Sequence, residues 1–487
     1  MTSPAPSAAQ SVPGSSSAAT PGAAPPAAQT RTFDRSIVEG PIARAVWRLA
    51  WPTVLQNAIG GLQGIIDHAM VGHYVGYTGN AAIGVSWQIF LVVIVFISSL
   101  FTGMGVLVAR FAGANEPDRV NRTVYQAFLT SVIMAVGVMA PFGYFFSPAL
   151  LELVNATPEV RAEALPYLRT MFVFGIGLLL FFMLGGALRS AGDARTPLRL
   201  GAAATVLNIG LNVVLITGLG PFPALGTMGA AVGTVIATSL VSGVALWMMC
   251  TGKLVVHFPR TMSWAPDWGI IRQLFRFGLP AGIQGVAMNV GGVLLLRFIG
   301  SLEHSAEAQA AYAVGYAELF SLITWTSVGL MGAAAAVAGQ NLGAGRPERS
   351  MHAVHIAARY GLGVAAIVGA AFVLVPEQLL AIFGLREPVV VAIGTQLLRF
   401  LSVSGFFITV ALTYTGGLQG TGDTRSPLVI TLISQVALPI GICWFFQSTG
   451  TLESGEVWTA ILVGHITRCV LSLIRFRQGK WRHIVVE

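Results

Sequence analysis

The chain has 487 residues, of which 54% are hydrophobic and only 10% are charged. A soluble globular protein carries roughly 25% charged residues, so this composition excludes an ordinary soluble domain. The formal net charge of +8 does not indicate a nucleic-acid partner, because the basic residues stand in short tracts between apolar runs, where the orientation of membrane segments accounts for them.

Residues 1–40 are predicted to form a disordered tail, because the chain begins with an Ala-, Pro- and Ser-rich stretch that has no ionisable side chain before Arg31. A membrane span needs about 20 mostly apolar residues, and the rest of the chain offers twelve such segments. Two crossings each are predicted for 49–109 and 200–252, and single crossings for 123–151, 165–188, 273–300, 308–338, 352–375, 390–418, 427–447 and 456–474. The predicted fold class is an all-α integral membrane protein, since the segments lack the alternating pattern of a β-barrel.

The placement of Lys and Arg predicts the orientation of these spans. Of the 28 basic residues, 22 fall on the side of the membrane that carries the N-terminus. Cytoplasmic loops carry the excess of Lys and Arg, so we expect a multi-pass protein of the cell (inner or plasma) membrane with both termini in the cytoplasm. The exceptions are Arg161, Arg169 and Arg386 at outer ends and Arg297, Arg399 and Arg468 inside spans.

The two halves of the chain are copies of one another. The segment GGALRSAGDARTPL at 185–198 matches GGLQGTGDTRSPL at 416–428, and the Gly, Asp, Arg and Pro of this turn recur 230 positions later. Six spans per half give two parallel repeats, which form two pseudo-symmetric lobes around a central cleft and rock against each other in secondary transporters. The predicted domains after the tail are an N-lobe at 41–252, a linker at 253–271, a C-lobe at 272–476 and a cytoplasmic C-terminal tail at 477–487.

The repeated G-D-x-R-[ST]-P turn has a structural explanation. Gly192 and Gly422 supply the backbone conformation that ends one helix, and Asp193 and Asp423 can cap the next helix, whose first turn suits the proline. We expect the turn to fix local structure and topology. The alternative is a gate, in which the arginine of the turn closes the cytoplasmic face.

Several motifs resemble those of the multidrug and toxic compound extrusion (MATE) family. They are LAWP with IIDHAMVGHYVG in the first span, GALRSAGDARTP followed by LNIGLNVVLI, and VAGQNLGAGRPERS preceded by YAELFSLITWTSVGL. The similarity covers about residues 40–475, and the motifs agree with the family in order and spacing. The resemblance implies twelve helices in two lobes and export of organic, often cationic compounds, driven by inward flow of protons or sodium ions.

Asp67 and Glu318 are the two carboxylates inside the predicted spans. A charged side chain near the bilayer centre costs at least about 2.5–3.5 kcal/mol on insertion scales, so each is a functional candidate. The helical face of Asp67 also carries Gln56, Gly60 and Gln63. This polar stripe can line the substrate cleft while Asp67 gains and loses a proton, and the alternative is an Asp that only packs the lobe. The resemblance places Asp67 at the family's N-lobe cation-site aspartate.

The fifth predicted span carries Thr205, Asn208 and Asn212 on one face. Such amides bridge to a carboxylate or offer oxygens to a small cation, and the alternative is polar contact between helices. By the resemblance, Asn208 matches the Asn of the family's cation site and Thr234 a further oxygen ligand, whereas Asn212 stands where many relatives have an Asp. Asp67 is then the single formal charge of the cation-coupling site, which implies no resident metal and at most weak Na⁺ binding.

Glu318 shares a helical face with Trp325, and an aromatic ring beside a carboxylate suits an organic cation. We therefore predict that both line the cleft, and the alternative is a Glu paired with Arg297 or a group on the ninth span. The sodium-coupled branch of the family has acids in the seventh and tenth helices, which this chain lacks apart from Glu387 at an edge. The pattern resembles the proton-coupled, DNA-damage-inducible branch.

The predicted function is secondary active efflux: an antiporter exports small cationic or amphipathic organic compounds in exchange for inward H⁺, or alternatively Na⁺. The alternatives are a lipid-linked oligosaccharide flippase, whose anionic substrate needs several basic residues in the cleft, and a narrow-specificity metabolite exporter of the same superfamily. Since no nucleophile elbow or phosphate-binding glycine loop is present, we expect neither an enzyme nor a cofactor. The expected partners are the substrate and the lipid bilayer, without nucleic acid, and we expect a monomer.

Overall fold

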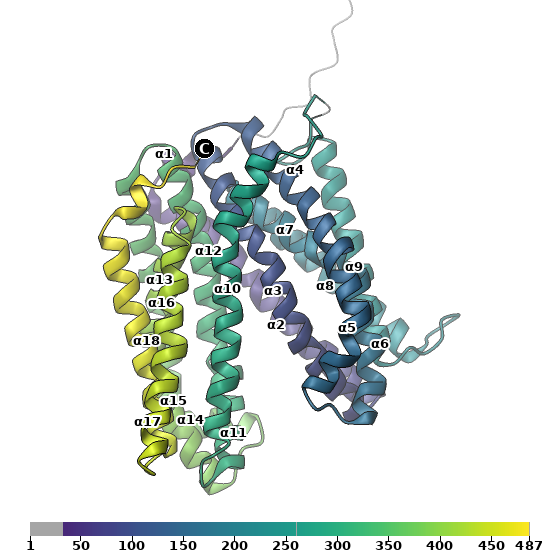
Figure 1. The fold of residues 1–487 in the computed structure, drawn as a ribbon, viewed down its shortest axis with the longest axis vertical. Coiled ribbons are helices and arrows are strands. Elements are labelled where there is room, and N and C mark those ends of the chain that lie inside the picture. The colour runs from purple at the N-terminus through teal and green to yellow at the C-terminus, as the bar shows by residue number, and fades with distance from the viewer. Residues whose placement is uncertain (1–32, 260, 487) are drawn as a thin grey trace, which may run out of the picture.

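The computed structural model describes residues 33–259 and 261–486, and these residues form a bundle of helices without any β-strand (Figure 1). The first half contributes α1 (Ser36–Glu39), α2 (Ile42–Tyr74), α3 (Tyr77–Gly113), α4 (Pro117–Met134), η1 (Ala135–Met139), α5 (Ala140–Leu153), α6 (Pro158–Phe174), α7 (Ile176–Ser190), α8 (Arg195–Thr217) and α9 (Thr227–Cys250). The second half contributes α10 (Trp268–Ile299), α11 (Ser305–Tyr312), η2 (Ala313–Leu319), α12 (Ser321–Gly343), α13 (Pro347–Leu374), α14 (Pro376–Ile382), α15 (Pro388–Gly420), α16 (Arg425–Thr431), η3 (Leu432–Ala437), α17 (Leu438–Ser448), α18 (Ser454–Arg477) and η4 (Lys480–His483).

The long helices follow the predicted spans in order. Ten helical segments of the described chain are long and apolar enough to cross a membrane, and α6 with α7, bent by 52°, gives an eleventh. The remaining long helix, α2, has 33 residues, but the polar stripe that includes Gln56, Gln63 and Asp67 makes it less apolar. With α2 as the twelfth span, the all-helical fold class predicted from the sequence is confirmed.

The helices form two lobes, α2–α9 and α10–α18. They converge at the end of the bundle that carries α1 and the C-terminus, here called the termini-bearing end, and spread apart toward the end that carries α11, α14 and α17 (Figure 1). Between the lobes, α3 packs along α10, and α12 packs against α2 and α3. The end of the predicted linker, 253–271, belongs to α10, because that helix begins at Trp268.

Two glycines allow α3 and α12 to meet closely at the termini-bearing end. Gly113 lies against the backbone of Gln340, and Gly343, 230 positions after Gly113, lies against the backbone of Arg110. A Cβ atom at either glycine would collide with the opposite helix. Gln340 also donates a hydrogen bond of 2.7 Å to the carbonyl oxygen of Ser190. A symmetric crossing of the two lobes therefore closes this end.

Both terminal segments of the described chain contact the opposite lobe. Arg346 and Arg349 of the C-lobe donate to carbonyl oxygens at the end of α1 and just after it, at 2.8 and 2.6 Å. At the other end of the chain, Arg110 of α3 donates to the carbonyl oxygen of Ile484, and Trp481 is buried. The terminal segments thus brace the closure made by α3 and α12.

The disordered tail predicted for residues 1–40 is wrong for residues 33–40. Three apolar side chains there, Phe33, Ile37 and Val38, are buried, and their burial supplies the driving force for order that the preceding Ala-, Pro- and Ser-rich stretch lacks. Residues 1–32 of the predicted tail lie outside the described residues.

Candidate functional site

The two copies of the G-D-x-R-[ST]-P turn have the same backbone geometry. The φ angle is +99° at both Gly192 and Gly422, a conformation that favours glycine. Asp193 accepts hydrogen bonds from the backbone nitrogen and the hydroxyl of the residue three positions later, at 3.0 and 2.6 Å. Asp423 accepts the corresponding two bonds at 3.2 and 2.8 Å. The turn therefore ends one helix and caps the next, as predicted from the sequence.

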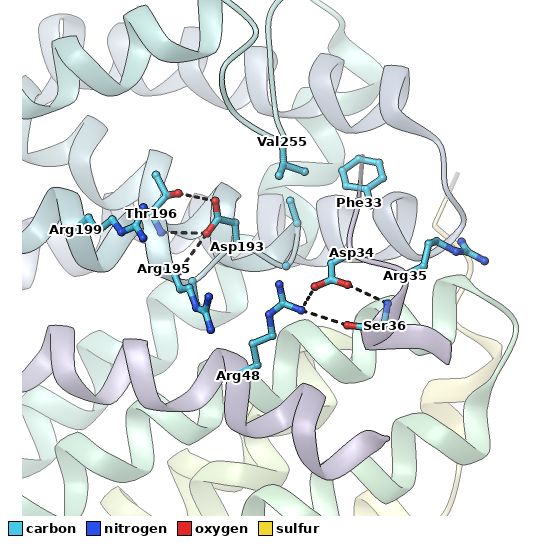
Figure 2. Close-up of a pocket in the computed structure, with 13 residues that line it drawn as sticks. Phe33, Asp34, Arg35, Ser36, Arg48, Asp193, Arg195, Thr196, Arg199 and Val255 are labelled. Atoms are coloured by element: carbon cyan, nitrogen blue, oxygen red, sulfur yellow. Dashed lines mark hydrogen bonds and ion pairs between the residues drawn. The ribbon is translucent and has the colours of Figure 1, made fainter. Parts of the chain in front are cut away.

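A pocket of about 860 Å³ opens beside the N-lobe turn at the termini-bearing end (Figure 2). Its acidic side chains already have partners, because Asp193 caps α8 and Asp34 pairs with Arg48. Arg195 and Arg199 line the same pocket and are exposed. None of the predicted cation-coupling or substrate residues lines it, so we assign this pocket to the closed end of the bundle and not to the transport site.

A second cavity of about 300 Å³, the N-lobe cavity, lies inside the N-lobe. Helices α2, α3, α7, α8 and α9 supply most of its walls, and α12 reaches it from the C-lobe. The predicted site residues that line it are Gln56, Gln63, Asp67, Thr234 and Trp325. The sequence stripe on α2 therefore faces a cavity.

Asp67 is held by side chains from α8. Asn212 donates from Nδ2 to Oδ1 of Asp67 at 2.7 Å and to Oδ1 of Asn208 at 3.3 Å. Asn208 lies 3.0 Å from Oγ1 of Thr234. With its amide turned over, Asn208 accepts from Thr234 and donates to Asp67 at 3.2 Å, and the bond from Asn212 to its oxygen is then lost. The structure thus brings together all four residues predicted for the cation-coupling site, with both asparagines buried.

Two features of this cluster bear on its chemistry. Asp67 forms no ion pair with any described residue, so neutral amides are its nearest partners. The side-chain oxygen of Asn212 is buried and has no hydrogen-bond partner within 33–259 and 261–486. In the same part of the chain, no group of three or more His, Cys, Asp or Glu side chains is arranged to hold a metal ion.

The two glutamines of the α2 stripe bind to other helices of the N-lobe. Gln63 accepts a hydrogen bond of 2.8 Å from the hydroxyl of Thr205 on α8. Gln56 accepts a hydrogen bond of 3.2 Å from Nη1 of Arg189, in the last turn of α7. The α2 stripe is therefore hydrogen-bonded to α8 through Gln63 and to α7 through Gln56.

A third cavity, the central cavity, has a volume of about 520 Å³ and lies between the lobes. Helices α2, α3 and α7 of the N-lobe and α12 and α15 of the C-lobe line it. Asn57 and Phe182 line both this cavity and the N-lobe cavity, so the two share walls. Of the described residues that line the central cavity, Arg189 alone is charged.

Glu318 lies on η2 with an exposed side chain, and it lines neither the N-lobe cavity nor the central cavity. The alternative ion pair with Arg297 is absent, because Glu318 forms no ion pair among the described residues. Trp325 does reach the N-lobe cavity, and its carbonyl oxygen accepts a hydrogen bond of 3.2 Å from Asn57 of α2. The structure thus places Trp325 at a contact between lobes and leaves Glu318 apart from Asp67.

The sequence analysis missed three side chains that line these cavities. Tyr167 and Trp87 face the N-lobe cavity with Asp67, and Arg189 lines the central cavity. The repeat offers a signal for Arg189, because at the 230-residue offset this charged residue aligns with a neutral one, Gln419. The two aromatic residues gave no comparable signal, since aromatic side chains are common throughout the spans.

Comparison with known proteins agrees with this architecture. The family model MatE matches residues 52–214 and 280–445. The chain is 26% identical over 444 residues to the probable multidrug resistance protein NorM of Thermotoga maritima, with 90% of this chain and 93% of the relative covered. It is 25% identical over 453 residues to the multidrug resistance protein PmpM of Pseudomonas aeruginosa, with 90% and 91% covered.

Solved structures share the fold. A multidrug resistance MATE family transporter of the MOP superfamily, in an outward-facing conformation, superposes with a TM-score of 0.85 at 20% identity, covering 93% of this chain and all of that one. A MOP superfamily transporter from Pyrococcus furiosus gives a TM-score of 0.83 at 21% identity with 93% of this chain covered. With the matched segments falling one in each lobe, the chain belongs to the MATE family of efflux transporters.

Proposed function

We propose that this transporter is a proton-coupled antiporter, which exports small amphipathic organic compounds through the central cavity and takes up H⁺ at Asp67. The observation that carries the proposal is the 2.7 Å contact between Asp67 and Asn212, in a cavity that shares walls with the space between the lobes. A carboxyl group in a membrane span is costly unless it has a task. Asp67 has no basic partner among the described residues, so its charge is free to change.

The coupling ion is proposed to be H⁺ because the site offers little to a larger cation. Asp67 is the only formal charge among the four cation-coupling residues, and tight cation binding needs several charged or well-placed oxygen ligands. A protonated carboxyl gains a donor that the ionised form lacks. The oxygen of Asn212 has no partner among the described residues and lies against Gly233, and it can accept from protonated Asp67 once the Asn212 amide turns over.

The transport cycle follows from the two lobes. The termini-bearing end is closed by the crossing of α3 and α12, and we propose that this end faces the cytoplasm, because most basic residues lie there. Substrate then leaves from the opposite end, where the lobes spread apart (Figure 1). For antiport, the proton and the substrate must favour opposite states of the two lobes or compete for one state.

The test is export of a fluorescent amphipathic dye, the zwitterionic rhodamine acid, from proteoliposomes, under an imposed proton gradient and then under a sodium gradient. The variants are wild type, Asp67→Asn and the control Asp118→Asn, which makes the same chemical change at an exposed position of α4. We expect proton-driven export by wild type and Asp118→Asn, and at least a tenfold loss in Asp67→Asn, because the amide cannot exchange a proton. Unchanged folding is checked by gel filtration.

Two results would contradict the proposal. Full proton-driven export by Asp67→Asn would move the coupling group elsewhere, and sodium-driven export alone would make the coupling ion Na⁺. If well-folded wild-type protein moved no dye under either gradient, that result would favour a lipid-linked oligosaccharide flippase or a narrow-specificity metabolite exporter.

A further inference from the structure

Arg189 is a cation without a counter-charge at the wall of the central cavity. Its side chain donates to Oε1 of Gln56 at 3.2 Å, and within 33–259 and 261–486 no carboxylate pairs with it. The other polar groups that line the cavity are neutral, and include Thr53, Asn57 and Ser98. The described lining of the cavity therefore carries a net charge of one positive unit.

The C-lobe contains the same contact without the charge. Gln419 occupies the position 230 residues after Arg189, and Gln284 follows Gln56 at an offset of 228. Gln419 donates to Oε1 of Gln284 at 3.1 Å, and it lines the same cavity. A neutral amide is thus sufficient to tie the end of the helix to its neighbour. The positive charge of Arg189 is not needed for that structural task.

Partial burial makes this charge effective. A cavity with low-dielectric walls concentrates the field of a fixed charge, because few water molecules screen it. The walls near Arg189 include apolar side chains of both lobes, among them Phe101, Phe182 and Met331. A volume of about 520 Å³ falls in the range of roughly 300–1,000 Å³ that is typical of small-molecule sites.

We propose that the preferred substrates carry an anionic group, namely a carboxylate, sulfonate or phosphate on an apolar body, and that Arg189 binds this group. A guanidinium presents several N–H donors in a plane that matches such anions. The apolar body then lies against the aromatic and aliphatic walls of the cavity. This inference rests on the proposed export through the central cavity, and it narrows the substrate class.

The test uses two forms of one fluorophore, a rhodamine with a free carboxylate and the methyl ester of the same rhodamine. Binding to detergent-purified full-length protein is measured by fluorescence anisotropy without any ion gradient. We expect wild type to bind the acid more tightly than the ester. Arg189→Gln copies the C-lobe pair, so it should fold normally and weaken binding of the acid by about 10- to 100-fold. Binding of the ester, which is a cation, should stay unchanged or become tighter, because a repulsive charge is removed.

Two further variants separate binding from bracing. Arg189→Lys keeps the charge and should retain part of the preference for the acid, as a point charge without the planar fork. Adding Gln419→Arg to Arg189→Gln returns a cation to the symmetric position on the cavity wall and should restore tighter binding of the acid. If Arg189 only braces α7, neither the lysine nor the transferred arginine is expected to restore binding of the acid selectively.

The outcomes decide between the two roles. A selective loss for the acid, with rescue by either cation, supports anion recognition by Arg189. Equal loss for acid and ester, or no loss for either, would overturn it. Because binding is measured without a gradient, dye that binds as expected but fails to move with protons would refute the proposed antiport and leave this inference standing.

Discussion

The last turns of α7 and α15 make matching contacts in the two lobes, Arg189 with Gln56 at 3.2 Å and Gln419 with Gln284 at 3.1 Å. The helix caps that follow also match, with the same φ of +99° at both glycines of the turn. The lobes therefore keep the same backbone and the same contact between helices. What differs at this point is charge, which only the N-lobe carries.

The interiors of the two lobes differ more strongly. The N-lobe encloses a cavity with Asp67 on its wall. The C-lobe residue that corresponds to Thr238 of that cavity wall, 230 positions later, is Arg468. The side chain of Arg468 is buried, and its Nη1 atom lies 4.0 Å from the sulfur of Met288. Aromatic rings stack in the interior of the C-lobe, with 6.2 Å between the ring centroids of Tyr312 and Trp458.

The two lobes therefore share a scaffold but differ in their ionisable side chains, with Asp67 in the N-lobe and Arg468 in the C-lobe. Capping turns and close helix crossings depend on backbone geometry, so both lobes need them for folding. A proton site needs one acid in one accessible cavity, and a second copy adds cost in the membrane. We therefore expect coupling to reside in the N-lobe, and four sets of variants test this difference between the lobes.

The largest effect is expected from Asn212→Ile, which gives the N-lobe a side chain like that of Ile442, its counterpart in the C-lobe. The change removes the 2.7 Å hydrogen bond to Asp67. Loss of a bond to a charged group costs about 1.5–3 kcal/mol, so we expect a lower melting temperature and at least a tenfold loss of proton-driven export. Ile442→Val serves as the control, and equal damage by both variants would contradict a site confined to the N-lobe.

A smaller effect, shared by both lobes, is expected from Gly113→Val and Gly343→Val. Each places a side chain against the backbone of the opposite helix, and overpacking costs about 1–3 kcal/mol. We expect a lower melting temperature and several-fold slower transport, because the closed termini-bearing end is destabilised. Gly137→Val is the matched control, since nothing lies within 4 Å of a Cβ atom there. A loss in only one of the two glycine variants would mean that the crossing is not symmetric.

A small effect is expected from Glu318→Gln, because the exposed Glu318 lines neither the N-lobe cavity nor the central cavity. We expect export of cationic and neutral substrates to stay within about twofold of wild type, since solvent screens an exposed charge. The measurement compares export of a cationic and a neutral dye under the same proton gradient. An equal loss for both dyes would make Glu318 a structural residue.

The smallest effect is expected from Arg468→Met. Replacing a buried charged group by an apolar side chain of similar volume is often neutral or stabilising, and volume-conserving core changes cost less than about 1.5 kcal/mol. We expect a melting temperature close to that of wild type and normal proton-driven export. Loss of proton-driven export with intact folding would mean that Arg468 takes part in coupling, and the coupling site would then not be confined to the N-lobe.

Much of the fold could be predicted from the sequence because its signals are local. Hydropathy located the spans, and the 230-residue offset identified the duplicated turn. Helical periodicity placed Asn208 and Asn212 on one face of α8 and Gln63 on the face of Asp67. Their meeting beside Asp67 needed only the packing of α2 against α8.

Other features depend on contacts between distant segments and had no local signal. Order in α1 depends on Arg346 and Arg349, which lie in the other lobe. The 52° bend between α6 and α7 occurs at Gly175, one of 57 glycines. Arg189 lies close in sequence to the basic turn at the interface, so its position on the wall of the central cavity emerged only from the structure.

The most direct test of single-site coupling in the N-lobe is proton release on substrate binding. Purified protein in lightly buffered detergent solution is mixed with the rhodamine acid, and a pH indicator records released protons for wild type, Asp67→Asn and Arg468→Met. We expect release by wild type and Arg468→Met and none by Asp67→Asn, at saturating dye in each case. Undiminished release by Asp67→Asn would contradict single-site coupling in the N-lobe.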